Sequence, residues 1–280
     1  KGISEKEPIR LRLRNLNNTL HFDIAAGGIS PTLFQADTFP PPFRDNIRVI
    51  HDGIDTAHVC PNPEAKLVIS EGLTLSRSDE VISFVNRNLE PNRGCHTFFR
   101  ALPKILRNRP KAHVVVVGID GVSYGAPPPV GTTWKQKYID EVRDDISDAD
   151  WSRVHFTGRI PYDEFISLLQ VSRAHVYLTY PFVLSWSLLE TMSAGGAILA
   201  SDTAPVREVI FDDETGLLTD FFDTEALADN LNRLLDDAKL RSRLGMAARQ
   251  LVLDRFDLEK ICLPQQLQWV DALAQTPVRP

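Results

Sequence analysis

The chain has 280 residues, of which 43% are hydrophobic and 24% are charged. These values are typical of a folded globular protein whose length allows one large domain or two of ordinary size, and they argue against disorder. A net charge of −6, with no long run of Lys or Arg, argues against nucleic acid as a partner. No apolar stretch approaches the roughly 18 residues that cross a bilayer, and no signal peptide is recognisable, so we expect a cytoplasmic protein.

The first 62 residues differ from the rest of the chain. A basic amphipathic helix is predicted at 10–20, and a short strand at 22–30, a Pro-rich turn and a strand at 46–55 follow it. Such a piece cannot bury a core alone, so we interpret residues 1–62 as the end of a preceding domain and a linker. The leucines that recur at helical spacing mark the face that packed against that domain: Leu13, Leu16 and Leu20. Because the chain begins with Lys and not Met, we expect a fragment or a processed protein.

Between residues 63 and 257, short β-branched runs alternate with longer helical patterns, which indicates βα units and a parallel sheet. The predicted strands lie at 81–85, 113–117, 153–156, 174–179, 197–201 and 216–219. The predicted helices lie at 95–108, 135–146, 162–172, 186–194, 205–210 and 224–236. Each step between strands has room for a right-handed crossover, so the pattern predicts an α/β fold with a doubly wound, Rossmann-like parallel sheet.

The segments around this core are less regular. Residues 60–77 are predicted to form a connecting segment, and the Gly- and Pro-rich loop at 121–133 is expected to be mobile. Two further helical patterns, at 238–253 and 258–274, have no strand between them and should pack outside the sheet. Residues 258–280 are therefore expected to form a C-terminal helix and a polar tail.

An arginine-rich loop follows the predicted strand at 81–85. Residues 86–94 read NRNLEPNRG and place Arg87 and Arg93 on one loop that opens a helix. Guanidinium groups bind phosphate bidentately, and each charge-assisted bond contributes roughly 1.5–3 kcal/mol. In isolation such a pair is more often a solvated loop. Its position at the carboxyl edge of a doubly wound sheet, where these folds bind ligands, favours a phosphate site.

A helix start and a carboxylate extend the predicted phosphate site. The turn after the strand at 174–179 leads to Ser185, Trp186 and Ser187, where free backbone N–H groups and the helix dipole favour a phosphate. Glu190 lies on the same helix and could accept hydrogen bonds from a ribose diol. The alternative is that Glu190 only stabilises its helix electrostatically.

A base site is predicted at the end of the strand at 153–156. Gly158, Arg159 and Ile160 follow this strand, and the glycine would let a flat base lie against the backbone. Together with the arginine loop, the helix start and Glu190, this strand end describes a binding site for a nucleoside diphosphate.

Other polar and aromatic residues have a structural interpretation. Four histidines lie in or beside predicted strands, where structural roles are expected rather than catalysis: His51, His113, His155 and His175. His96 lies beside the arginine loop. Phe182 and Trp186 are expected in the core or in a pocket wall, and Glu208 is expected to cap a helix or to pair rather than to touch a ligand. The three cysteines lack metal-ligand spacing and are expected to be buried, reduced thiols: Cys60, Cys95 and Cys262.

At these residues the sequence resembles glycosyltransferase family 4. The stretch PFVLSWSLLETMSAGGAILASDTAPVREVI at 181–210 looks like the signature region of that family, in which a first Glu stands eight positions before a second Glu, here Glu190. Arg87 and the pair Arg93 and Gly94 are similar to the family's Gly-Arg … Lys-Gly diphosphate motif, and residues 156–158 match its base-binding strand end. The resemblance covers essentially the whole chain and is strongest over residues 47–258.

The resemblance implies the C-terminal, donor-binding half of a GT-B fold, with residues 1–62 as a remnant of the N-terminal acceptor domain. It implies a retaining glycosyltransferase that transfers a sugar from a nucleoside-diphosphate-sugar to a glycan or lipid-linked acceptor, in surface polysaccharide or glycan synthesis. It implies no metal and no other cofactor. The implied catalytic residues are Arg87, Arg93 and Glu190; the implied donor contacts are Arg87, Arg93, Ser185, Trp186 and Ser187 for the diphosphate, Glu190 for the ribose, and Gly158, Arg159 and Ile160 for the base.

The sequence departs from the family pattern at three positions. Phe182 stands where the family has its first Glu, near the donor sugar. Arg93 replaces the family Lys with one extra residue in the spacing, and Asn86 replaces a Gly. These departures put the contact with the sugar ring and the reach to the phosphate in question.

Phe182 and the missing N-terminal domain motivate an alternative function, a non-catalytic nucleotide-binding or interaction module. A sugar-nucleotide epimerase is disfavoured, because no acid and base residues can be placed for it. In this family the N-terminal domain supplies the acceptor site, so the isolated chain is expected to be weakly active or inactive. Two associations stay open: a peripheral contact between the basic helix and the inner face of a membrane, for which a solvated face is the simpler alternative, and a homodimer that covers the helix at 9–20.

Overall fold

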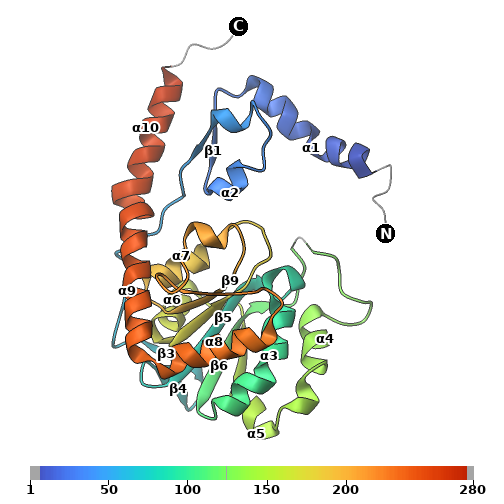
Figure 1. Cartoon of the computed structure of the whole chain (residues 1–280), viewed down its shortest axis with the longest axis vertical. Helices are drawn as coiled ribbons and strands as arrows, with labels where there is room; N and C mark the ends of the chain where they lie inside the picture. Colours follow the sequence, from blue (N-terminus) through green and yellow to red (C-terminus); the bar gives the residue numbers. More distant parts are fainter. Residues whose placement is uncertain (1–6, 124, 276–280) are drawn as a thin grey trace.

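The structure is a computed structural model and describes residues 7–123 and 125–275. Its centre is a six-stranded, wholly parallel sheet with the strand order β10-β9-β8-β5-β6-β7 (Figure 1). The strands are β5 (Glu80–Asn88), β6 (Ala112–Ile119), β7 (Val154–Gly158), β8 (Ala174–Tyr177), β9 (Ile198–Ser201) and β10 (Leu217–Thr219). All six predicted strands are present, and the predicted doubly wound α/β fold is confirmed.

Helices cover both faces of this sheet (Figure 1). One face packs against α3 (Cys95–Asn108), α4 (Trp134–Asp140) and α8 (Thr224–Asp236). The other face packs against α6 (Tyr162–Val171), α7 (Trp186–Ser193) and α9 (Ala238–Arg255). The valines of β6 are apolar on both sides because both faces of the sheet are covered. Val114 and Val116 belong to the first core, while Val115 and Val117 point to the opposite face.

Two predicted helices are shorter than expected. The helix predicted at 135–146 ends with α4, and a 3-10 turn, η3 (Arg143–Asp145), leads to a separate short helix, α5 (Asp148–Trp151). Ser147 accepts a hydrogen bond from the Asp150 N–H and so starts α5 as an N-cap. The helix predicted at 205–210 is only the 3-10 turn η4 (Val206–Glu208).

Residues 60–77 contain a β-hairpin that the sequence analysis described only as a connection. Strands β3 (Lys66–Ser70) and β4 (Leu73–Ser76) pair antiparallel around Gly72, which has a φ of 88°. The buried side chains of Leu67 and Leu75 pack with Val115 and Val117, so the hairpin covers part of one sheet face. The missed signal is Gly72, which separates two short runs with apolar residues at 67–69 and 73–75.

The N-terminal segment consists of α1 (Glu7–Ile24), β1 (Gly28–Ser30), α2 (Leu33–Ala36), the 3-10 turn η1 (Arg44–Asn46) and β2 (Ile47–Val49). Strands β1 and β2 form a separate two-stranded parallel sheet. The strand predicted at 22–30 is three residues long, because α1 continues to Ile24 before the glycines interrupt it. The strand predicted at 46–55 is likewise reduced to β2. The predicted leucine face of α1 is exposed, with Leu13 at 66%.

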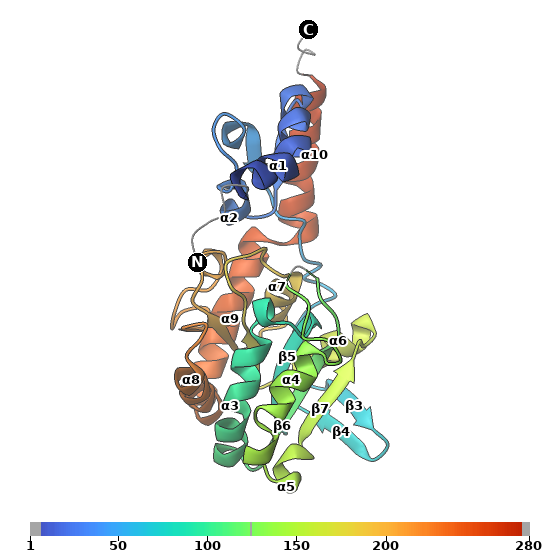
Figure 2. The same ribbon diagram turned by 90° about the vertical axis from the view of Figure 1, so that its right-hand side faces the viewer.

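The C-terminal helices lead back to this N-terminal segment. After α9, a π-helix, η5 (Leu258–Cys262), continues into α10 (Leu263–Ala274), which runs beside the N-terminal segment (Figure 2). At the crossing, the Ile54 N–H donates to the Phe256 carbonyl over 2.7 Å, and the Leu258 N–H donates to the Ile54 carbonyl over 2.9 Å. As predicted, neither helix contributes a strand to the sheet. The end of the predicted tail, residues 276–280, lies outside the described residues.

Candidate functional site

The strand order of the sheet reverses between the neighbours β5 and β8. Open α/β sheets bind ligands in the crevice outside the carboxyl ends of the strands at such a reversal. The loop after β5 ends in the 3-10 turn η2 (Pro91–Arg93), and the segment after β8 leads to α7. The topology therefore brings the arginine loop and the start of α7 to the same crevice.

Gly94 fixes the two loops against each other. It has a φ of 71°, and a Cβ atom on this residue would lie 2.2 Å from the Leu178 Cβ atom. Only glycine permits this close approach of the backbone to Leu178, the residue after β8. In addition, the Tyr180 N–H donates to the Asn92 carbonyl over 3.2 Å. The arginine loop is therefore held on the segment that leads into α7.

Arg93 is held over an aromatic ring. Its guanidinium carbon lies 5.2 Å from the centre of the Phe182 ring, a cation–π geometry. Burial raises the pKa of Tyr177, and the hydrogen bond from Ser185 and the charge of Arg93 oppose that rise. Among the described residues, Arg93 has no carboxylate partner within 4.0 Å. Its positive charge is thus positioned but not neutralised.

Arg87 lies on the last part of β5, and its side chain is exposed. It forms no ion pair or hydrogen bond within the part of the chain that the structure describes. The structure places Arg87 and Arg93 at the same strand end, but no contact joins their side chains. Arg87 therefore remains available to a ligand and is less fixed than Arg93.

The start of α7 offers fewer free amides than the sequence predicts. The Ser185 N–H donates to the Tyr177 hydroxyl oxygen over 2.9 Å, so this amide is already occupied. The amides of Trp186 and Ser187 have no acceptor among the described residues. The hydroxyl oxygens of Ser185 and Ser187 lie 2.9 Å apart. One of these hydroxyls donates to the other, so the two free amides and one hydroxyl remain as donors for an anion.

Trp186 is not a core residue. Its side chain is 56% exposed, and its indole N–H donates to an Asp52 carboxylate oxygen over 3.2 Å. Trp186 therefore does not lie in the core, whereas its position in a pocket wall stays a prediction. The indole instead joins the start of α7 to the linker that follows the N-terminal segment.

Glu190 faces the start of α6. The Tyr162 hydroxyl donates to a Glu190 carboxylate oxygen over 2.7 Å. The side chain of Glu190 is buried, and this burial raises its pKa, while the bond from Tyr162 opposes the rise. Glu190 has no hydrogen bond to the amides at the start of its own helix among the described residues. Through Tyr162, Glu190 is bonded to the chain just after the segment at 158–160.

That segment is the predicted base site, and it borders open space. Gly158 has a φ of 68°, and no atom lies within 4 Å of the position that a Cβ atom would occupy. The side chain of Arg159 is exposed, and that of Ile160 is half-buried. Both residues line a cavity of about 550 Å³ that also borders Val68 of the β3–β4 hairpin. A flat group could lie there without displacing a side chain.

Glu90 is a residue of this region that the sequence analysis missed. It is 1% exposed and accepts hydrogen bonds from the Ser123 N–H over 3.1 Å and from the Gly125 N–H over 3.4 Å. The Asn88 side-chain amide also donates to the Ser123 hydroxyl. The loop at 121–133, expected to be mobile, is therefore anchored at its beginning beside β5. The available signal was a carboxylate two residues after the end of β5.

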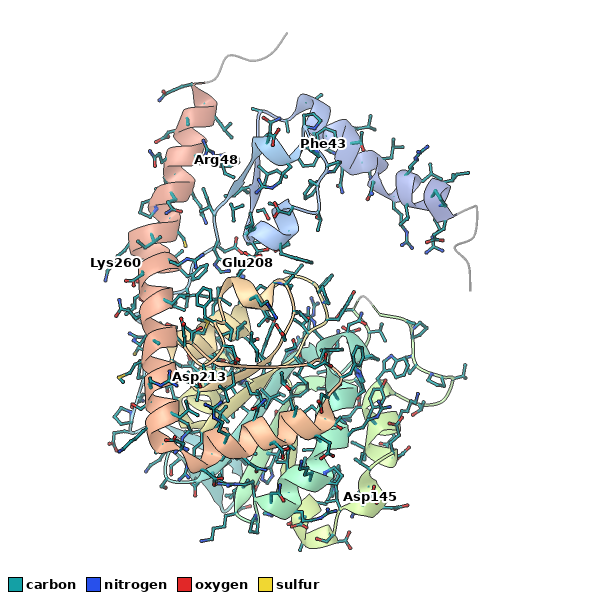
Figure 3. All side chains as sticks on the ribbon, in the orientation of Figure 1. Phe43, Arg48, Asp145, Glu208, Asp213 and Lys260 are labelled. Carbon is teal, nitrogen blue, oxygen red and sulfur yellow. The ribbon has the colours of Figure 1, made fainter. Side chains whose placement is uncertain are left out.

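Several structural interpretations are confirmed. His175 is fully buried, its pKa is lowered to about 3 by burial, and its Nδ1 atom lies 2.9 Å from the Ser83 hydroxyl. Glu208 accepts hydrogen bonds from the Leu33 N–H over 2.9 Å and the Phe34 N–H over 2.5 Å, so it caps α2 from the other half of the molecule (Figure 3). All three cysteines are free thiols; Cys95 and Cys262 are buried, and Cys60 is only half-buried.

The described residues offer neither a metal site nor a membrane-spanning helix. Within residues 7–123 and 125–275, no group of three or more His, Cys, Asp or Glu side chains could hold a metal ion. No helix in the same part of the chain has the length and apolar character needed to span a membrane.

The parallel sheet and the reversal of its strand order define an α/β, Rossmann-like domain of the GT-B type. The chain belongs to the family of glycosyl transferases group 1, whose model matches residues 69–251. A second model, the glycosyl transferase family 4 group, matches residues 2–59. The resemblance to this family found in the sequence is therefore confirmed. It extends to the N-terminal residues, because residues 2–59 match the family 4 model.

Known relatives and structures agree with this assignment. The D-inositol 3-phosphate glycosyltransferase of Corynebacterium efficiens is 25% identical over 205 residues, which are 73% of this chain and 46% of that protein. The chain thus spans about half the length of this curated relative. Sucrose-phosphate synthase from Thermosynechococcus elongatus has a similar fold, with a TM-score of 0.73, 21% identity and coverage of 98% of this chain and 65% of that chain. Anabaena Alr3699/HepE, solved in complex with UDP, has a TM-score of 0.72, 19% identity and coverage of 98% and 70%.

Proposed function

We propose that this chain supplies the donor site of a retaining glycosyltransferase, which transfers a sugar from a nucleoside-diphosphate-sugar to an acceptor in glycan or surface polysaccharide synthesis. The nucleotide would lie along the carboxyl edge of the sheet. Its base would contact Gly158, Arg159 and Ile160, its ribose Glu190, and its diphosphate Arg87, Arg93 and the start of α7 at Ser185, Trp186 and Ser187.

The observation that carries the proposal is the order of groups along α7. Ser187 and Glu190 are three residues apart and therefore lie on one face of the helix. The end of α7 near Ser187 has free donors for phosphate, and Glu190 meets Tyr162, two residues after Ile160. The site thus offers donors for phosphate, then an acceptor for a diol, then an open surface for a base. This is the order of diphosphate, ribose and base in a nucleotide.

The same groups support a chemical step. Negative charge grows on the leaving diphosphate as the glycosidic bond breaks, and donors that are already in place stabilise it without reorganisation. Arg93 is held over Phe182 before any ligand binds, and the dipole of α7 has a fixed direction. We propose that these positive groups take the role that a metal ion has in other transferases, so that transfer needs no metal.

Phe182 limits what this half can do with the sugar. An apolar ring stands where the family has a carboxylate, so the donor sugar would receive no carboxylate contact from this position. The orientation of the sugar and the acceptor would then depend on groups outside residues 63–257. We therefore propose that residues 1–62 belong to an acceptor domain, and that the chain alone binds donor but transfers sugar weakly or not at all.

Calorimetry with UDP, GDP, ADP and TDP and their sugars tests the donor site. We expect one nucleoside diphosphate to bind with a dissociation constant below about 1 mM, which corresponds to a binding free energy of roughly −4 kcal/mol. UDP is the first ligand to test, because the similar HepE structure contains it. Binding of none of the four nucleotides would contradict the proposal.

A second measurement separates an enzyme from a binding module. A longer chain that includes a complete N-terminal domain should release nucleoside diphosphate in the presence of donor and acceptor, and EDTA should leave the rate unchanged. Donor binding with no transfer across a panel of acceptors would instead favour the non-catalytic nucleotide-binding module.

A further inference from the structure

A second cavity lies at the amino-terminal edge of the sheet, opposite the proposed donor site. It has a volume of about 470 Å³. Its lining comes from the residues that precede β8 and β9, from α9, and from Arg77, which follows the β3–β4 hairpin. Four arginines line it and no carboxylate does: Arg77, Arg173, Arg241 and Arg249. In a chain with a net charge of −6, this is an unusual local excess of positive charge.

Three of these arginines are fixed in place by backbone carbonyls. Arg241 donates through one terminal nitrogen to the carbonyls of Leu234 and Leu235, over 2.6 and 2.7 Å. Arg249 donates to the Ser193 carbonyl, and Arg173 donates to the Ser78 carbonyl over 2.5 Å. A guanidinium has five N–H donors, so each of these side chains keeps donors for a ligand. Their positions are set before a ligand arrives.

The positive charge in the cavity is largely uncompensated. Among the described residues, Arg77, Arg241 and Arg249 have no carboxylate within 4.0 Å. Arg173 lies 3.9 Å from Glu80, but that carboxylate already binds Arg109 through two bonds of 2.8 and 2.7 Å.

The same imbalance affects the titration of one arginine. Burial lowers the pKa of Arg241, and the charge of Arg173 lowers it further, against the opposing effects of Glu80 and Asp237. Arg241 is half-buried, and a partly desolvated cation with a neighbour of like charge is stabilised by a bound anion.

The geometry points to an anion-binding site in this cavity for a small, soluble ligand with two or more negative charges, such as a phosphorylated metabolite. The volume lies within the range of about 300–1,000 Å³ that is common for small-molecule sites. Arginine in particular suits phosphate, because its planar group binds two oxygens at once. Nothing in the donor-site proposal uses these four residues.

The cavity is structurally separate from the donor site but touches the same helix. Ala194 and Gly195, which line it, follow the last residue of α7, whose first turn lies at the donor site. An eight-residue helix is about 12 Å long, so one anion could not occupy both places. A Cβ atom on Gly245 of α9 would lie 2.2 Å from the Gly195 carbonyl oxygen, so α9 and this turn are in direct backbone contact.

Pyrophosphate is a suitable probe, with calorimetry on the whole chain. We expect the double variant Arg87→Gln, Arg93→Gln to retain one pyrophosphate site, because that variant removes only the proposed donor contacts. In this background, Arg77→Gln should weaken the remaining site by about tenfold, the effect of losing one charge-assisted bond. Arg77 is exposed and has no hydrogen bond among the described residues, so its replacement should not disturb folding.

The control is Arg12→Gln, which removes one exposed positive charge from α1 and should leave the affinity unchanged. Hydrogen exchange locates the ligand: pyrophosphate should slow exchange at residues 194–197 and 241–249 in the double variant. Loss of all binding in the double variant, or equal effects of Arg77→Gln and Arg12→Gln, would overturn the cavity site. Failure of the donor proposal alone gives a different result. The wild type would then bind one pyrophosphate, and this binding would depend on Arg77 and not on Arg87.

Discussion

The hydroxyl of Tyr162 donates a 2.7 Å hydrogen bond to the carboxylate of Glu190, and this contact joins α6 to α7 at the centre of the proposed donor site. A buried carboxylate with a single neutral donor is costly to ionise. Without a bound nucleotide, Glu190 therefore destabilises the fold in its charged form. A ribose diol would add two donors and remove part of that cost.

Replacing Glu190 tests this cost through its pH dependence. The pKa of Glu190 is raised above its usual value of 4.5, so the folded state holds this proton more tightly than the unfolded chain does. Its contribution to stability is therefore present at low pH and is lost as the pH rises through the raised value. Glu190→Gln should raise the melting temperature relative to wild type more at pH 8 than at pH 4, as measured by calorimetry. Glu71→Gln, an exposed change in the hairpin, should show no such difference, and an equal gain at both pH values would contradict the assignment.

Arg87→Ala should separate phosphate contacts from base contacts. Loss of one charge-assisted bond is expected to weaken nucleoside diphosphate binding by roughly 1.5–3 kcal/mol and to affect the nucleoside little. Titration of both ligands into both proteins measures the difference. Equal losses for the two ligands would assign Arg87 a structural role. Arg159→Ala, which removes an exposed arginine from the predicted base segment, is the matched comparison and should affect the nucleoside as well.

Gly94→Ala should destabilise the chain strongly. The added methyl group would meet the Leu178 Cβ atom at 2.2 Å in a backbone conformation that already disfavours a side chain. We expect the free energy of unfolding in urea to fall by about 3 kcal/mol or more, from backbone strain and overpacking together. Gly72→Ala is the control, because its φ of 88° is also positive but nothing lies within 4 Å. It should cost only about 1–2 kcal/mol, and similar losses for both variants would show that the contact with Leu178 does not matter.

Glu208→Ala should release α2 from the sheet-bearing half of the chain. The Leu33 and Phe34 amides would lose their charged acceptor, and because the site is partly exposed, water replaces part of it, so we expect a cost of about 1–2 kcal/mol. Hydrogen exchange at these two amides should become faster, while exchange in β5 should not change. Glu214→Ala removes an exposed carboxylate nearby in sequence and serves as the control. Unchanged exchange at Leu33 and Phe34 would show that the cap does not hold α2.

The sequence predicted the sheet and the position of the site because both depend on local patterns. Strands such as β6 are continuously apolar, and the residues that follow each strand must gather at one edge of a parallel sheet. The candidate residues Arg93 and Glu190 and the start of α7 were predicted in this way. Helix 135–146 was predicted too long because the N-cap at Ser147 was not recognised as a new start.

Contacts between distant residues could not be predicted in the same way. Tyr162 meets Glu190 only because α6 and α7 pack on the same sheet face, and Glu90 meets Ser123 only because β5 and β6 are neighbours. The occupation of the Ser185 amide by Tyr177 is of the same kind. Sequence spacing gives the direction of a side chain along its own element, whereas its partner depends on tertiary packing.

Ile54, bonded to both Phe256 and Leu258, places the two chain connections between the sheet and the N-terminal segment side by side. Because the chain around Ile54 and the chain at 256–258 are bonded to each other, the two connections resist twisting but still permit bending. A rotation of the N-terminal segment against the sheet would therefore bend the chain at these two connections and break the bonds from the α2 amides to Glu208. Such a rotation would change the access to the carboxyl edge of the sheet and leave Arg93, the start of α7 and Glu190 in place relative to one another.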